Sequence, residues 1–142
     1  MTLFKSSPDD FVEFSKLTNG HIDLYIVDRS SVSKLWAALD AGDPTARCIW
    51  RAVDQLLRHV RRVKCGRGPL CLDCETEFHK TSELPGAFMV VVPFANPAAA
   101  MVTAICETCT ATKNLNAASL RAVRQIWPNV MVDHSRHMEK IQ

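Results

Sequence analysis

The chain has 142 residues and a mass of 15.9 kDa, with 47% hydrophobic residues, 23% charged residues and a formal net charge of +2 at pH 7. This length suits one domain, and the apolar fraction can supply a hydrophobic core, which argues against a disordered chain. No run of apolar residues is long enough for a transmembrane helix. The polar first ten residues, with Pro8 among them, lack the features of an export signal, so we expect a cytoplasmic location.

The first third of the chain predicts short helices around one strand. Apolar residues recur at helical spacing over residues 11–17 and again over 32–39. Between them, after the break at residues 18–20, residues 21–28 alternate apolar and polar side chains in the manner of a half-buried strand.

A long amphipathic helix is predicted over residues 44–64. Asp43 is placed to cap it and Pro44 to occupy its first position. Segment 46–70 carries seven basic side chains and one acidic side chain, and the helical repeat places its arginines opposite the apolar face. Because guanidinium groups bind phosphates well, this face is a candidate nucleic-acid surface, although a solvated helix face has the same pattern. The arginines are Arg47, Arg51, Arg58, Arg61 and Arg62.

Four of the six cysteines form two Cys-x-x-Cys pairs, Cys71 with Cys74 and Cys106 with Cys109. Two intervening residues let a tight turn aim both sulfurs at one point, and two such turns complete a tetrahedral zinc site. The segment between the pairs predicts a β-hairpin, with strands over residues 87–94 and 99–105. The hairpin would bring the two pairs together at one end.

Residues 70–127 resemble zinc-ribbon and treble-clef domains, which hold one structural zinc between two cysteine pairs. The likeness consists of the two Cys-x-x-Cys motifs and the order of cysteine pair, hairpin, cysteine pair and helix, with the helix expected over residues 116–127. The expected fold is α+β. A mainly helical part with one short strand (1–69) would pack on a zinc-binding module (70–142) as one compact unit.

Other uses of the cysteines stay open at this point. An iron–sulfur cluster also takes four thiolates, and a single Cys-x-x-Cys pair can act as a redox couple. Cys48 is expected to be a buried thiol on the long helix, and Cys65 is the one credible substitute ligand. His79 could replace a thiolate, but a surface or supporting role is expected for it.

The motifs favour binding over catalysis. Four thiolates close the coordination sphere of zinc, whereas catalytic zinc keeps an open position. The chain has no phosphate-binding glycine loop and no Gly-x-Ser-x-Gly nucleophile motif. We therefore expect a non-enzymatic, protein-interaction or regulatory zinc protein, with nucleic-acid binding through the arginine face and thiol redox chemistry as alternatives. The tryptophans Trp36, Trp50 and Trp127 are expected in the core.

Overall fold

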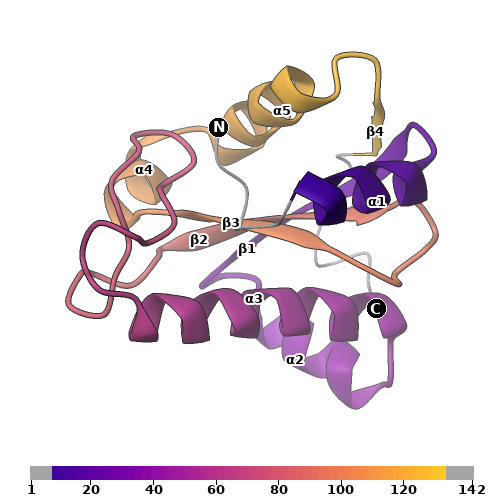
Figure 1. The fold of residues 1–142 in the computed structure, drawn as a ribbon. Helices are drawn as coiled ribbons and strands as arrows, with labels where there is room; N and C mark the ends of the chain where they lie inside the picture. Colours follow the sequence, from indigo (N-terminus) through magenta and orange to yellow (C-terminus); the bar gives the residue numbers. More distant parts are fainter. Residues whose placement is uncertain (1–7, 134–142) are drawn as a thin grey trace.

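A computed structural model describes residues 8–133 and shows a mixed four-stranded sheet with helices on both faces (Figure 1). The α+β class predicted from the sequence is confirmed. The helices are α1 (Pro8–Thr18), α2 (Val32–Asp40), α3 (Pro44–Arg62), α4 (Glu107–Thr112) and α5 (Leu115–Ile126). The strands are β1 (His21–Asp28), β2 (Ala87–Pro93), β3 (Met101–Ile105) and β4 (Met131–Asp133).

The sheet joins strands from both halves of the chain in the order β3-β2-β1-β4. β2 and β3 form the predicted antiparallel hairpin. β1 also pairs antiparallel with β2, with Tyr25 opposite Val90, and β4 runs parallel to β1. The N-terminal strand is therefore hydrogen bonded directly to the hairpin that carries the second cysteine pair.

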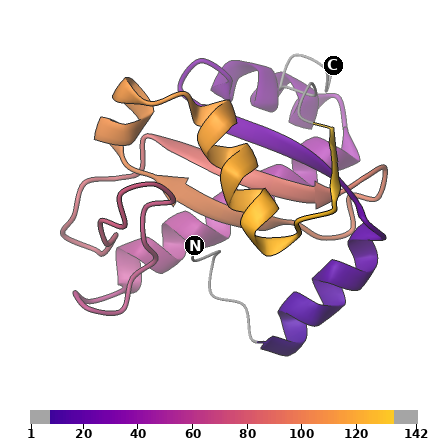
Figure 2. The same cartoon turned by 90° about the horizontal axis from the view of Figure 1, so that it is seen from above.

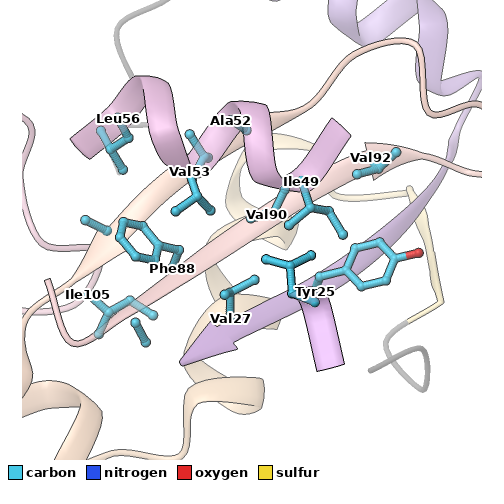
Figure 3. Packing of buried hydrophobic residues seen from close by; sticks show 14 of the residues in the cluster. Tyr25, Val27, Ile49, Ala52, Val53, Leu56, Phe88, Val90, Val92 and Ile105 are labelled. Carbon is cyan, nitrogen blue, oxygen red and sulfur yellow. The ribbon is translucent and has the colours of Figure 1, made fainter. Parts of the chain in front are cut away.

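Two apolar clusters cover the two faces of the sheet. On one face, α2 and α3 pack against alternate residues of the strands, and Figure 3 shows Ile49 and Val53 of α3 over Val90 of β2. On the other face, α1 and α5 contribute Phe14 and Val123 to the second cluster, and Figure 2 shows α5 lying across the strands. Every residue of β2 is buried, as expected for a strand covered on both faces.

This double covering corrects two expectations about burial. β1 was predicted to be half-buried, but Asp23 and Tyr25 are only 3% and 2% exposed, because β1 is a central strand with helices on each side. Trp36 was expected in the core, yet it is 48% exposed at the surface of α2. Its ring packs against Trp50 of α3, with ring centroids 4.9 Å apart.

Candidate metal centre

The first cysteine pair lies in a tight turn at the end of a two-armed stem. The arms, residues 63–70 and 76–80, run antiparallel, since the backbone amide of Phe78 donates to the Pro69 carbonyl at 2.8 Å and that of Lys80 to the Val63 carbonyl at 3.0 Å. At the tip, the Cys71 amide donates to the Thr76 carbonyl at 2.8 Å. The turn therefore holds both cysteines of the pair at one end of a hydrogen-bonded loop.

The second cysteine pair begins helix α4 directly. Cys106 follows the last residue of β3 and is the N-cap of α4, where its sulfur accepts a hydrogen bond from the Cys109 amide at 3.4 Å. The prediction from sequence had no helix at this position and began the next helix at residue 116. It missed α4 because the six residues Glu-Thr-Cys-Thr-Ala-Thr have no apolar helical face, and the following helix, α5, begins at Leu115.

The two pairs converge as the sequence predicts. The sulfurs of Cys71, Cys74, Cys106 and Cys109 all lie within 4.8 Å of one another, and those of Cys74 and Cys106 are 3.6 Å apart. Sulfurs around a tetrahedral Zn²⁺ with bonds of about 2.3 Å are separated by about 3.8 Å, so the spacing fits this ion. Four thiol donors are also the set that structural zinc prefers. The residues present therefore fit a metal ion of this kind.

Backbone amides and charged side chains surround the sulfurs. The Cys106 amide donates to Cys71 Sγ at 3.3 Å, and Cys109 Sγ lies 3.7 Å from Asp73 Oδ2, to which it donates. Lys113 Nζ pairs with the same Asp73 oxygen at 3.6 Å. Amide donors of this kind stabilise thiolates, which are the form that binds a metal.

The thiols differ in how readily they lose a proton. Hydrogen bonds from Thr76, first from its hydroxyl and then from its backbone amide, lower the pKa of Cys74 to about 6. Burial raises the pKa of Cys106 and Cys109 above the ordinary value for a thiol. The exposed Cys74 therefore loses its proton more readily than Cys106 or Cys109, and a bound cation would favour ionisation of the latter two.

The two remaining cysteines lie apart from this cluster. Cys48 is half-buried on α3, and burial raises the pKa of its thiol. Cys65 is exposed and belongs to a second group of potential metal ligands, together with Glu77 and His79. From the sequence, Cys65 and His79 are each a substitute ligand for the four-cysteine site, and nothing local connects them, because their proximity depends on the antiparallel stem.

An apolar groove of about 630 Å³ runs between the α2/α3 pair and α4. Trp36 and Trp50 line one wall, and Glu107 and Thr110 of α4 line the other. Arg29 and Glu107 form an ion pair at 3.5 Å, and both side chains are largely exposed. Because Cys106 caps α4 and Cys109 lies within it, one wall of this groove is directly connected to the four-cysteine cluster.

The arginines predicted to lie on the outer face of the long helix are exposed to solvent. All five predicted arginines are exposed on α3, whose apolar residues pack against the sheet, and Arg58 Nε pairs with Asp54 Oδ2 at 2.8 Å. The positions are Arg47, Arg51, Arg58, Arg61 and Arg62. They lie on a different element from the four clustered cysteines.

The helices within residues 8–133 are all too short or too polar to cross a membrane. Comparison with models of known protein families, with curated proteins and with solved structures finds no match.

Proposed function

We propose that this chain is a zinc-binding protein with one structural Zn²⁺, acting without catalysis as a protein-interaction or regulatory module. The observation that carries the proposal is the convergence of four sulfurs from two separate turns to within 4.8 Å. The ion would be held by Cys71, Cys74, Cys106 and Cys109. When bound, it supplies a cross-link between the stem and the short helix α4.

The composition of the site supports a structural ion. A catalytic zinc keeps one coordination position for water or substrate, whereas four thiolates complete the tetrahedron. Two of the four cysteines, Cys71 and Cys109, are also buried and belong to the same apolar cluster as α3 and the sheet. One side of such a site is part of the core, so a bound ion would stabilise the chain around it.

The groove supports an interaction role. We assign to it an apolar segment of a partner protein, whose side chains would contact Trp36 and Trp50 and the facing side of α4. Tryptophans dominate the binding energy of many protein interfaces, and a Trp that is 48% exposed is available to a partner. Since α4 depends on the cysteine cluster, partner binding would depend on the metal.

The zinc assignment is tested by elemental analysis of the purified protein together with thiol titration before and after chelation. We expect four thiols to be shielded by tightly held zinc and to react once the metal is removed. Cys74→Ser should lose this zinc, while Cys48→Ser, which alters a cysteine outside the cluster, should retain it. Iron in the purified protein would contradict the zinc assignment and indicate an iron–sulfur cluster. A metal-free protein with an oxidised Cys-x-x-Cys pair would indicate thiol redox chemistry.

The interaction role is tested by selecting random peptides on the zinc-loaded chain, with Trp36→Ala as the counter-target. We expect apolar peptides that bind the wild type, lose affinity for Trp36→Ala and dissociate when zinc is chelated. Val12→Ala is the matched control, because Val12 is also an exposed apolar residue but lies on α1, on the opposite face of the sheet. Peptides that bind Trp36→Ala as tightly as the wild type would contradict the assignment of the groove.

Nucleic-acid binding is a second candidate function, supported by the exposure of all five arginines on one side of α3. Such a surface would bind phosphates through charge, and its affinity would fall steeply with salt. The chain as a whole carries a net charge of only +2, so any such binding would depend on this local surface.

A further inference from the structure

Three side chains of different chemistry meet on the stem, outside the four-cysteine cluster. The sulfur of Cys65, a carboxylate oxygen of Glu77 and a ring nitrogen of His79 all lie within 4.8 Å of one another. Cys65 is exposed and the other two are partly exposed, so the group can be reached from solvent. Thiolate, carboxylate and imidazole are the three ligand types that bind zinc in proteins.

The antiparallel stem explains why these residues meet. Phe78 is only 2% exposed and points into the core, so its neighbours Glu77 and His79 point to the opposite side of this extended arm. The hydrogen bond from the Lys80 amide to the Val63 carbonyl holds the other arm alongside. The Gly66 amide, next to Cys65 in the chain, donates to the Glu77 carboxylate, which holds Cys65 beside the outward side of the arm.

Hydrogen bonds also fix two of the three side chains. The Glu77 carboxylate accepts from the Gly66 amide at 2.7 Å through one oxygen and from the Gly68 amide at 3.3 Å through the other, which holds the pKa of Glu77 below its usual range. Each oxygen keeps a lone pair for a further partner. The His79 ring is held through Nδ1, which lies 2.9 Å from the Thr81 hydroxyl oxygen.

We propose that Cys65, Glu77 and His79 form a second metal site, which takes Zn²⁺ or a similar divalent transition-metal ion and leaves one coordination position open. Glu77 is the centre of this group, because its carboxylate also interacts with the Cys65 thiol through a hydrogen bond and with the His79 ring through charge. Metal sites regularly contain groups that orient the ligating side chains through hydrogen bonds. Here Thr81 orients the His79 ring, and the amides of Gly66 and Gly68 orient the Glu77 carboxylate. This proposal does not depend on the role assigned to the four-cysteine site.

The experiment measures zinc bound per full-length chain across a series of buffered free-zinc concentrations. We expect two ions for the wild type, the second weaker than the first, and one ion for the variant carrying Cys65→Ser and His79→Asn. Cys48→Ser should keep two ions. Replacing both His134 and His137, which lie outside the described residues, by alanine should also leave two. Thr81→Ala should keep two sites but weaken the second by about 10- to 100-fold, because it removes a partner of the His79 ring.

Alkylation followed by peptide mass spectrometry measures the protection of each cysteine, and thus the occupancy of each site, even for a variant that folds poorly. In the wild type, the second equivalent of zinc should protect Cys65, after the first has protected the four clustered cysteines. A wild type that binds one ion throughout, or a second ion that persists in the Cys65→Ser, His79→Asn variant, would overturn the second site. Protection of Cys65 without protection of the clustered cysteines would instead contradict the four-cysteine proposal and leave the second site standing.

Discussion

The backbone of Gly68 lies directly against that of Phe78: a Cβ atom at position 68 would be 1.6 Å from the Phe78 carbonyl oxygen. The contact joins the two arms of the stem at the level where the Phe78 amide bonds to the Pro69 carbonyl. Only glycine allows the arms to approach this closely. This glycine therefore determines the geometry of the cysteine turn at the tip of the stem. It also determines how Cys65, Glu77 and His79 lie relative to one another on the stem.

Gly68→Ala should consequently destabilise the folded protein by about 2 kcal/mol or more, because backbone atoms must move to admit the methyl group. Chemical denaturation at saturating zinc measures the change. Gly42→Ala is the control, since Gly42 has a positive φ of 81° but open space around it. It should lose only about 1 kcal/mol of backbone conformational energy and should retain zinc as the wild type does. Equal losses in the two variants would show that the close approach is unimportant.

Glu75 adopts a left-handed backbone conformation, with φ of 63°, immediately after the first cysteine pair. This conformation is unfavourable for a residue with a side chain by about 1–2 kcal/mol. Glu75→Gly should therefore raise the denaturation midpoint of the zinc-loaded protein, with a net gain of about 0.5–1 kcal/mol after the extra freedom of glycine in the unfolded chain is counted. Glu83→Gly, at an exposed position without a positive φ, should be neutral or destabilising.

The sequence predicts the α+β class, the hairpin and the converging cysteine pairs, because these depend on local patterns and on a fixed ligand spacing. It does not reveal α4, whose six residues lack an apolar periodicity and whose N-cap is a cysteine. A cysteine sulfur can accept the capping hydrogen bond as a hydroxyl does, but the residue type gives no helix-start signal in the sequence.

Features that depend on tertiary contacts are the ones the sequence leaves open. The covering of β1 on both faces requires α1 and α5 to lie opposite α2 and α3, and no local pattern specifies that arrangement. The exposure of Trp36 likewise depends on the position of α2 at the edge of the groove. The grouping of Cys65 with Glu77 and His79 requires the register of the stem, which is set by a few long-range backbone hydrogen bonds.

Removal of zinc should loosen one end of the molecule and leave the sheet folded. The stem has few regular hydrogen bonds, whereas β1 and β2 are paired along their whole length and buried between two helical layers. On chelation we expect fast amide hydrogen exchange over residues 64–86 and in α4, with continued protection in β1 and β2. Simultaneous loss of protection in β1 and β2 would mean that the metal supports the whole fold, as in small zinc domains.

The exposed arginines of α3 can be replaced with little effect on the stability of the fold, so their contribution to DNA binding can be measured separately. Replacing Arg58 and Arg62 by alanine should change stability by no more than about 0.5 kcal/mol, since both side chains are exposed and the pair between Arg58 and Asp54 is at the surface. If the second candidate function holds, the same double variant should bind duplex DNA more weakly, and the slope of log affinity against log salt should fall by about 2.

The matched control replaces Lys16 and Arg121 by alanine. It removes the same charge from two exposed residues of α1 and α5, on the other face of the sheet. Because the net charge of the two double variants is equal, a difference between them reports on the position of the charges. Equal affinity for DNA in both variants, or binding that does not respond to salt, would contradict nucleic-acid binding through the arginines of α3.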